Sequence, residues 1–162
     1  MKKIYYIIPC LIFVLFGNMS LSFAQENTSV PAIDFGPSEA LTITGKSGSH
    51  IFDVEIADTL QEQARGLMFR NSLAPNKGML FEFDTPKVSS IWMKNTAIPL
   101  DILFVQSSGR IIKIVHSHRP YTLQSVTSEA VVSGVVEIPG GRAQELGITV
   151  GDFVVHEFFQ TP

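Results

Sequence analysis

The ten residues from Trp92 to Asp101 hold the densest group of side chains in the sequence that could do chemistry. The ammonium group of Lys94 and the carboxylate of Asp101 flank a segment that contains Pro99. Proline disfavours helical backbone in the residue before it, so this segment should be extended or turned. We therefore predict that the chain reverses over residues 95–100, and that Lys94 and Asp101 form a charge-assisted pair at the mouth of a hairpin.

Three neighbours of Lys94 complete this candidate binding site. Asn95 and Thr96 supply neutral hydrogen-bond donors and acceptors. Trp92 supplies a flat apolar face of about 200 Å², whose burial would stabilise the fold by roughly 5 kcal/mol at about 25 cal/mol per Å². Trp92 could serve as a core anchor or as a pocket wall. Lys94 could be the partner in a structural ion pair, or a desolvated base or nucleophile.

A second cluster of cationic and apolar side chains runs from Arg65 to Arg70. Both arginines are expected near the C-terminal end of a helix, where the backbone dipole favours positive charge. A guanidinium group can also hold a carboxylate or a phosphate through two parallel hydrogen bonds. Arg65 is therefore a further candidate binding residue.

Metal and cofactor signatures are weak. His116 and His118 would face the same side of a strand, a spacing that can hold a metal if His50, Glu137 or His156 supplies a third ligand. Two histidines at this spacing are common by chance, so we predict no metal. The sequence also lacks a phosphate loop, a nucleophile elbow, a zinc-protease helix motif and a dinucleotide fingerprint, so no cofactor is predicted.

The elements that must position these residues are mostly short strands. Alternating or continuous apolar runs predict strands over 41–45, 51–56, 79–83, 90–93, 101–105, 111–115, 135–138 and 153–158. The first two should form a hairpin, and residues 119–132 should cross the outside of the sheet. Many short strands favour a β-rich α+β domain whose sheet is rolled or half closed like a barrel, because closure removes sheet edges.

Two short helices complete the predicted domain. A capping box at Thr59 and Glu62 opens a helix over 60–68 that should pack on the sheet through its apolar side chains, Leu60, Ala64, Leu67 and Met68. Gly66 within it suggests the close approach of another backbone. The pair Gly140-Gly141 opens a second helix, which Gly147 should end.

The N-terminus carries the pattern of a secretory signal. Lys2 and Lys3 precede an apolar run over 4–16, and Ser22-Phe23-Ala24 supplies the small residues of a cleavage site. The run is shorter than the ~20 residues of a spanning helix, so a retained membrane anchor is the lesser alternative. We predict a signal peptide at 1–24, a flexible arm at 25–40 and one globular domain at 41–160, in a protein that is exported to the periplasm or secreted.

Cleavage after Ala24 would change the character of the chain. It removes Lys2, Lys3 and the only cysteine, Cys10, and leaves 10 basic and 15 acidic side chains, a net charge of −5. Thiol catalysis and disulfides are thus excluded in the mature form. Nucleic acid is not an expected partner, because phosphate binding needs a basic stripe and the basic residues here are scattered.

Several motifs together resemble a known family. They are Arg65 to Met68 (RGLM), Gly78 to Phe81 (GMLF), Trp92 to Thr96 (WMKNT), Ile98 to Asp101 (IPLD), Glu137, and Gly147-Ile148 followed by Gly151-Asp152. In this order and spacing the chain resembles the domain of unknown function 192 family over about residues 42–155. Gly140-Gly141 and Gln106 depart mildly from the family pattern, outside the central run. The resemblance implies a compact, mostly β domain with no established activity and no named cofactor.

Three functions are compatible with these residues. The first is an exported binding or envelope-associated domain that holds a small polar molecule, a glycan or an extended peptide near Trp92, Lys94, Asn95, Thr96 and Asp101. The second is a small hydrolase or lyase that uses Lys94 and Asp101 as base and acid, although no complete nucleophile–base–orienter set is readable. The third is a structural or partner-binding domain. A concave, partly exposed cluster would favour the first two.

Overall fold

A computed structural model describes residues 32–160 of the chain. The predicted signal peptide and the first residues of the predicted arm lie outside the described residues. The strands are β1 (Glu39–Gly45), β2 (Gly48–Ala57), β3 (Lys77–Ile91), β4 (Leu100–Val105), β5 (Ile111–His118), β6 (Val126–Pro139) and β7 (Phe153–Val155), and the helices are α1 (Leu60–Arg65) and α2 (Arg142–Glu145). Within this part of the chain, no helix is both long enough and apolar enough to span a bilayer.

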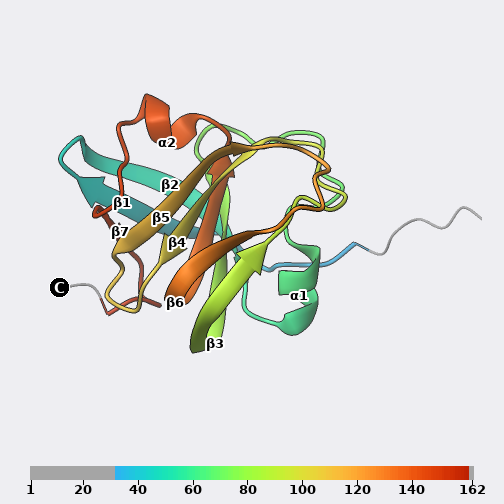
Figure 1. The fold of residues 1–162 in the computed structure, drawn as a ribbon, viewed down its shortest axis with the longest axis horizontal. Coiled ribbons are helices and arrows are strands. Elements are labelled where there is room, and N and C mark those ends of the chain that lie inside the picture. Colours follow the sequence, from blue (N-terminus) through green and yellow to red (C-terminus); the bar gives the residue numbers. More distant parts are fainter. Residues whose placement is uncertain (1–31, 161–162) are drawn as a thin grey trace, which may run out of the picture. The chain divides into compact units, whose positions relative to one another are not determined.

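All seven strands join one sheet in the order β5-β4-β6-β3-β2-β1-β7 (Figure 1). Only β2 and β3 pair in parallel; the other neighbours are antiparallel. The two ends of the sheet curl toward each other, and Ile111 N–H donates to the Asp152 carbonyl at 2.9 Å while Val154 N–H donates to the Gly109 carbonyl at 2.7 Å. The predicted β-rich, half-closed roll with two short helices is confirmed.

Both faces of the central strands are buried. One face, here called the α2 face, carries an apolar cluster to which Leu103, Val136, Ile138 and Ala143 of α2 belong. The opposite face, here called the α1 face, is covered by Leu67, Met93 and Ile98 from the segments that follow α1 and β3. Because side chains alternate along a strand, successive residues of β4 and β6 belong to different clusters. All six residues of β4 are buried, and all of them except Asp101 are apolar.

The first helix is shorter than predicted. Its capping box is confirmed: Glu62 N–H donates to Thr59 Oγ1 at 3.2 Å, and Thr59 N–H donates to Glu62 Oε2 at 2.9 Å. The helix ends at Arg65 because Gly66 has a φ of +47°. Leu60 was predicted to pack on the sheet and is 82 % exposed, which is a correction. The close neighbour of Gly66 is the ring of Phe81, 3.1 Å from where a Cβ would stand, and not a backbone.

The ribbon of β3 and β6 also corrects the sequence prediction. The segments 79–83 and 90–93 were expected to be separate strands, but β3 runs continuously from Lys77 to Ile91. Residues 119–132 do not cross the outside of the sheet, since β6 begins at Val126 and pairs with β3. The final strand, predicted over 153–158, ends at Val155.

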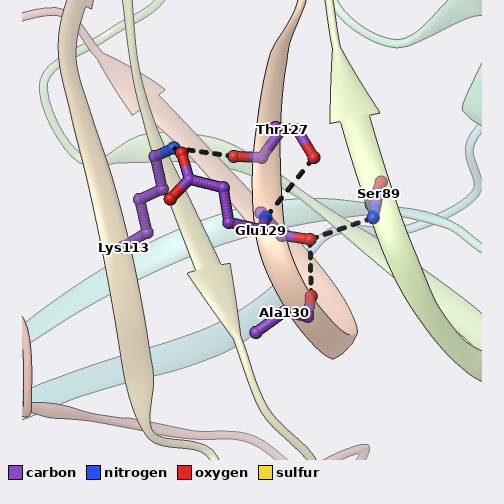
Figure 2. A network of polar contacts seen from close by, with 6 residues as sticks. Ser89, Lys113, Thr127, Glu129 and Ala130 are labelled. Carbon is purple, nitrogen blue, oxygen red and sulfur yellow. Dashed lines mark hydrogen bonds and ion pairs between the residues drawn. The ribbon is translucent and has the colours of Figure 1, made fainter.

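A bulge bends this ribbon where it approaches the site described below. Ser128 Oγ accepts the Ser89 N–H at 3.0 Å and donates to the Ala130 carbonyl at 2.6 Å. Glu129 has a φ of +61°, and its carboxylate pairs with Lys113, which also donates to the Thr127 carbonyl at 2.8 Å (Figure 2). The extra residues of the bulge, 128–130, lie on β6 opposite Ser89, directly before Ser90 and Ile91 of β3. Bulges of this kind often re-aim side chains beside functional sites.

Candidate functional site

The carboxylate of Asp101 is fully buried and cross-links the backbone on the α2 face. It accepts hydrogen bonds from the backbone N–H of Ser117 at 2.7 Å, of Gly141 at 2.8 Å and of Ala143 at 2.7 Å. Two of these amides open α2, where a negative charge satisfies N–H groups that have no partner within the helix. Asp101 therefore ties β5 and α2 to β4 and serves the fold.

The predicted ion pair between Lys94 and Asp101 is wrong. No ion pair joins the two residues in the described part of the chain; the Lys94 ammonium lies 5.2 Å from the centroid of the Trp92 ring instead. The register explains why. Asp101 pairs with Ile138, whose side chain belongs to the α2 face, whereas Leu100 belongs to the α1 face. Because side chains alternate along β4, the Asp101 carboxylate lies on the face opposite the loop that carries Lys94.

A cavity lies between the α1 face and its covering segments; its volume is about 80 Å³, or about 420 Å³ when the open solvent at its mouth is included. Sheet residues Phe81, Leu100 and Glu137 line it, and residues 63–68 and 90–92, together with Thr96, complete the wall. Three of the predicted binding residues, Arg65, Trp92 and Thr96, are thus brought together around one hollow. The other three, Lys94, Asn95 and Asp101, do not line it.

Glu137 is a functional candidate that the sequence indicated only as a possible third metal ligand and as part of the family pattern, not as a binding residue. It lies on β6 between Met79 and Ile102 of the neighbouring strands, and the residue is only 4 % exposed. Its side chain lines the cavity and makes no hydrogen bond or ion pair with residues 32–160. Burial raises the pKa of the Glu137 carboxyl to about 8, so at neutral pH it is mostly protonated and able to donate a hydrogen bond.

Arg65 brings a positive charge to the same cavity. It is partly buried, and its guanidinium carbon lies 4.6 Å from the centroid of the Phe69 ring. Arg70 pairs with Glu55, and Arg142 pairs with Glu145. Arg65 has no such carboxylate partner among the described residues. Its planar hydrogen-bond donors are therefore available to a bound group.

The remaining residues of the central run shape the rim of the cavity. Trp92 is 48 % exposed, so the core-anchor interpretation is wrong and the indole forms part of the wall. Asn95 has a φ of +54°; its carbonyl accepts the Phe69 N–H at 2.8 Å, and its amide donates to the Met68 sulfur at 3.9 Å. Thr96 is buried and donates its hydroxyl to the Lys94 carbonyl at 3.1 Å. These contacts fix the loop against the segment after α1.

The histidines do not assemble a metal centre. No group of three or more His, Cys, Asp or Glu side chains within residues 32–160 is arranged to hold a metal ion. His116 Nδ1 lies 4.0 Å from Asp101 Oδ1, and Ser117, with a φ of +45°, lies in an irregularity of β5 between the two histidines. His118 Nε2 is buried without a hydrogen-bond partner.

A separate hollow is lined by carboxylates from distant parts of the chain, namely Asp34, Glu39, Asp58, Glu62, Glu82 and Glu157. Burial, followed by the charges of Glu39, Asp58 and Glu157, raises the pKa of Glu82 to about 7. The buried ring of His156 lies 3.2 Å from Glu39 and 3.8 Å from Glu82. No sequence pattern predicts this cluster, because its members meet only after the sheet has formed.

Comparison with known proteins places the chain in a family. Residues 41–156 match the family DUF192, described as "Uncharacterized ACR". The chain belongs to the DUF192 family. The resemblance inferred from its motifs is confirmed, and the family description records no activity. A search of curated proteins finds no match.

Two solved structures share the DUF192 chain's fold. A protein of unknown function from Novosphingobium aromaticivorans is 40 % identical, with a TM-score of 0.74, and the match covers 80 % of this chain and 94 % of that one. A protein from Sinorhizobium meliloti, described provisionally as a transcription regulator, is 32 % identical with a TM-score of 0.75 and coverage of 80 % and 100 %. The fold is thus established for relatives, while the function has to be argued from the DUF192 site itself.

Proposed function

We propose that the protein is an exported binding domain of the periplasm or cell envelope that takes a small ligand into the cavity beside α1. The observation that carries this proposal is the buried carboxyl of Glu137, which lines the cavity without a partner among the described residues. Its oxygens keep a small exposure at the cavity, since they are not among the fully buried atoms without a partner in the described residues. A ligand oxygen that replaced water there would give the carboxyl the hydrogen bond that buried polar groups nearly always make.

The cavity also has the composition of a small-molecule site. Polar and apolar surface share its walls about equally, and polar groups converge on it from different elements: Arg65 at the end of α1, Thr96 from the loop and Glu137 from the sheet. Ligand sites commonly combine an apolar lining with a small number of such groups. Export is supported by the signal-like N-terminus, and it makes a molecule of the cell envelope the natural ligand.

The lining favours binding over the hydrolase or lyase alternative. Glu137 is its one carboxyl, and no histidine, cysteine or lysine is among the described residues that line the cavity. Asp101, the acid of the enzyme hypothesis, is buried on the opposite face under three backbone amides. A perturbed carboxyl alone supplies neither the nucleophile nor the second acid–base group that such chemistry needs.

Thermal unfolding of the protein purified after expression of the full chain tests this proposal. Envelope-derived sugars, peptides and small acids, alcohols and amines would be screened as ligands. A true ligand at 100 times its dissociation constant should stabilise the fold by about 2.7 kcal/mol, a shift of several degrees. Ser90→Trp, at an exposed lining position, should block that shift, whereas Ser72→Trp on the exposed surface outside the cavity should not. A shift that survives Ser90→Trp would contradict the proposed location.

A further inference from the structure

The cavity presents one sign of charge at neutral pH. Arg65 and Glu137 are the two ionisable side chains among the described residues that line it, and the buried Glu137 holds its proton. The guanidinium of Arg65 therefore gives the cavity a net positive charge. Lys94 adds a second positive charge near the rim, with its ammonium 5.2 Å from the centroid of the Trp92 ring. These positive charges would repel an ammonium ligand and attract an anion.

The backbone around Arg65 is arranged to hold its guanidinium in place. Phe69 has a φ of +64°, a left-handed conformation that is rare for a bulky side chain. Its N–H is held by the Asn95 carbonyl at 2.8 Å, and its ring lies under the Arg65 guanidinium at 4.6 Å. Strained residues of this kind tend to cluster at ligand sites, because the surrounding structure must maintain them. A stacked guanidinium keeps its edge N–H groups free, and these match the two oxygens of a carboxylate.

The rest of the lining defines the other parts of the ligand. Leu67, Phe81 and Leu100 are buried apolar side chains that line the cavity and can contact an apolar body. Two of the neutral polar side chains in the lining are already engaged, since Gln63 donates to the Glu82 carbonyl at 2.7 Å and Thr96 to the Lys94 carbonyl at 3.1 Å. The neutral Glu137 carboxyl carries an O–H that needs an acceptor oxygen. An anion at Arg65 is compatible with this neutral form, since a second negative charge nearby would oppose ionisation.

On the basis of the proposed function, we infer that the ligand is a small carboxylic acid with an apolar body. Its carboxylate binds Arg65, its body lies against Leu67, Phe81 and Leu100, and an oxygen of the ligand accepts a hydrogen bond from Glu137. This narrows the open choice among a polar molecule, a glycan and a peptide to one chemical class.

Matched ligand series distinguish this class from its rivals. Butyrate, hexanoate and 3-phenylpropionate, together with their 2-hydroxy acids, would be compared with the alcohols and amines of the same carbon skeletons by calorimetry and thermal shift. The acids should bind at least tenfold more tightly than the matched alcohols, and the amines should bind most weakly. Arg65→Gln should remove that preference, while Arg110→Gln, an exposed arginine that does not line the cavity, should leave it unchanged.

The pH dependence gives a second readout. Acid binding should weaken as pH rises above about 8, because ionised Glu137 would then repel the carboxylate. Glu137→Gln keeps a hydrogen-bond donor and should abolish this loss. The inference would be overturned if alcohols or amines bound as tightly as the acids, if Ser90→Trp blocked their binding and if Arg65→Gln did not change it. That result would leave the proposed function standing. No binding by any of the three series would overturn the inference. It would refute the binding function too if the wider envelope screen also failed.

Discussion

Replacing Glu137 with glutamine should change how the stability of the fold depends on pH. In the unfolded chain the Glu137 carboxyl titrates at its ordinary pKa near 4.5, and burial raises the pKa in the folded protein to about 8. Between these values the folded state holds a proton that the unfolded state has released. The free energy of unfolding therefore falls as pH rises, by about 1.4 kcal/mol per pH unit for one such group.

The total change in the free energy of unfolding follows from the difference between the folded and unfolded pKa values of Glu137. Over the window from about pH 4.5 to pH 8 it amounts to at most about 5 kcal/mol, which is a large part of the stability of an ordinary domain. Glu137→Gln has nearly the same shape and no carboxyl to ionise. The variant should match the wild type near pH 4.5 and become progressively more stable than it toward pH 8.

Urea unfolding at half-unit steps from pH 4.5 to pH 9 measures this difference directly. Glu82 contributes a slope of the same sign, but it is present in both proteins and cancels in the comparison. Glu145→Gln, at an exposed carboxylate paired with Arg142, is the matched control and should leave the wild-type slope unchanged. Parallel curves for wild type and Glu137→Gln would refute the assignment of a buried, protonated carboxyl to this position.

Three further results are expected. Asp101→Ala should destabilise the fold by about 3–5 kcal/mol, because one buried and two part-buried backbone amides lose their acceptor, whereas Lys94→Ala should cost less than about 1 kcal/mol. Their effects should add in the double variant, and a coupling above about 0.5 kcal/mol in denaturant curves would show an interaction that this geometry lacks. A chelator should leave the melting temperature unchanged; a loss that one added metal restores would point to a metal site. Mass spectrometry of the protein recovered from its host should find an N-terminus at or near Gln25, and an intact Met1 in a soluble cytoplasmic fraction would contradict export.

The architecture was predictable because it depends on local signals. The hairpin of β1 and β2, the capping box of α1 and the glycine that follows α2 each rest on a few neighbouring residues with a physical preference for one conformation. The half-closed roll followed from the number of strands alone. Boundaries failed where tertiary contacts decide, as at Leu60, whose apolar side chain found no partner.

The candidate site was only half predictable for a related reason. A short loop separates Lys94 from Asp101 in the sequence. Because side chains alternate along β4, Leu100 lies on the α1 face and Asp101 on the α2 face. A hydrophobic pattern shows which side chains of a strand face the core only when the other face is exposed to solvent, and here both faces are covered. Glu137 carried a readable signal: it is a lone carboxyl within the apolar run Val135 to Ile138. An acidic residue within a buried strand is a stronger indication of a site than charges in a loop, because such residues are rarely fully buried.

The pairing of β1 with β7 has a consequence for how the chain is made. The strand that begins the domain is completed on one edge by the strand that ends it, with Thr42 opposite Val155. About 110 residues separate them, so at 5–20 residues per second a growing chain carries β1 for roughly 5–20 s before β7 exists. During that interval the bare edge of β1 can accept a strand from another copy. Correct folding of this domain therefore depends on keeping newly made chains apart until their last strand has been synthesised.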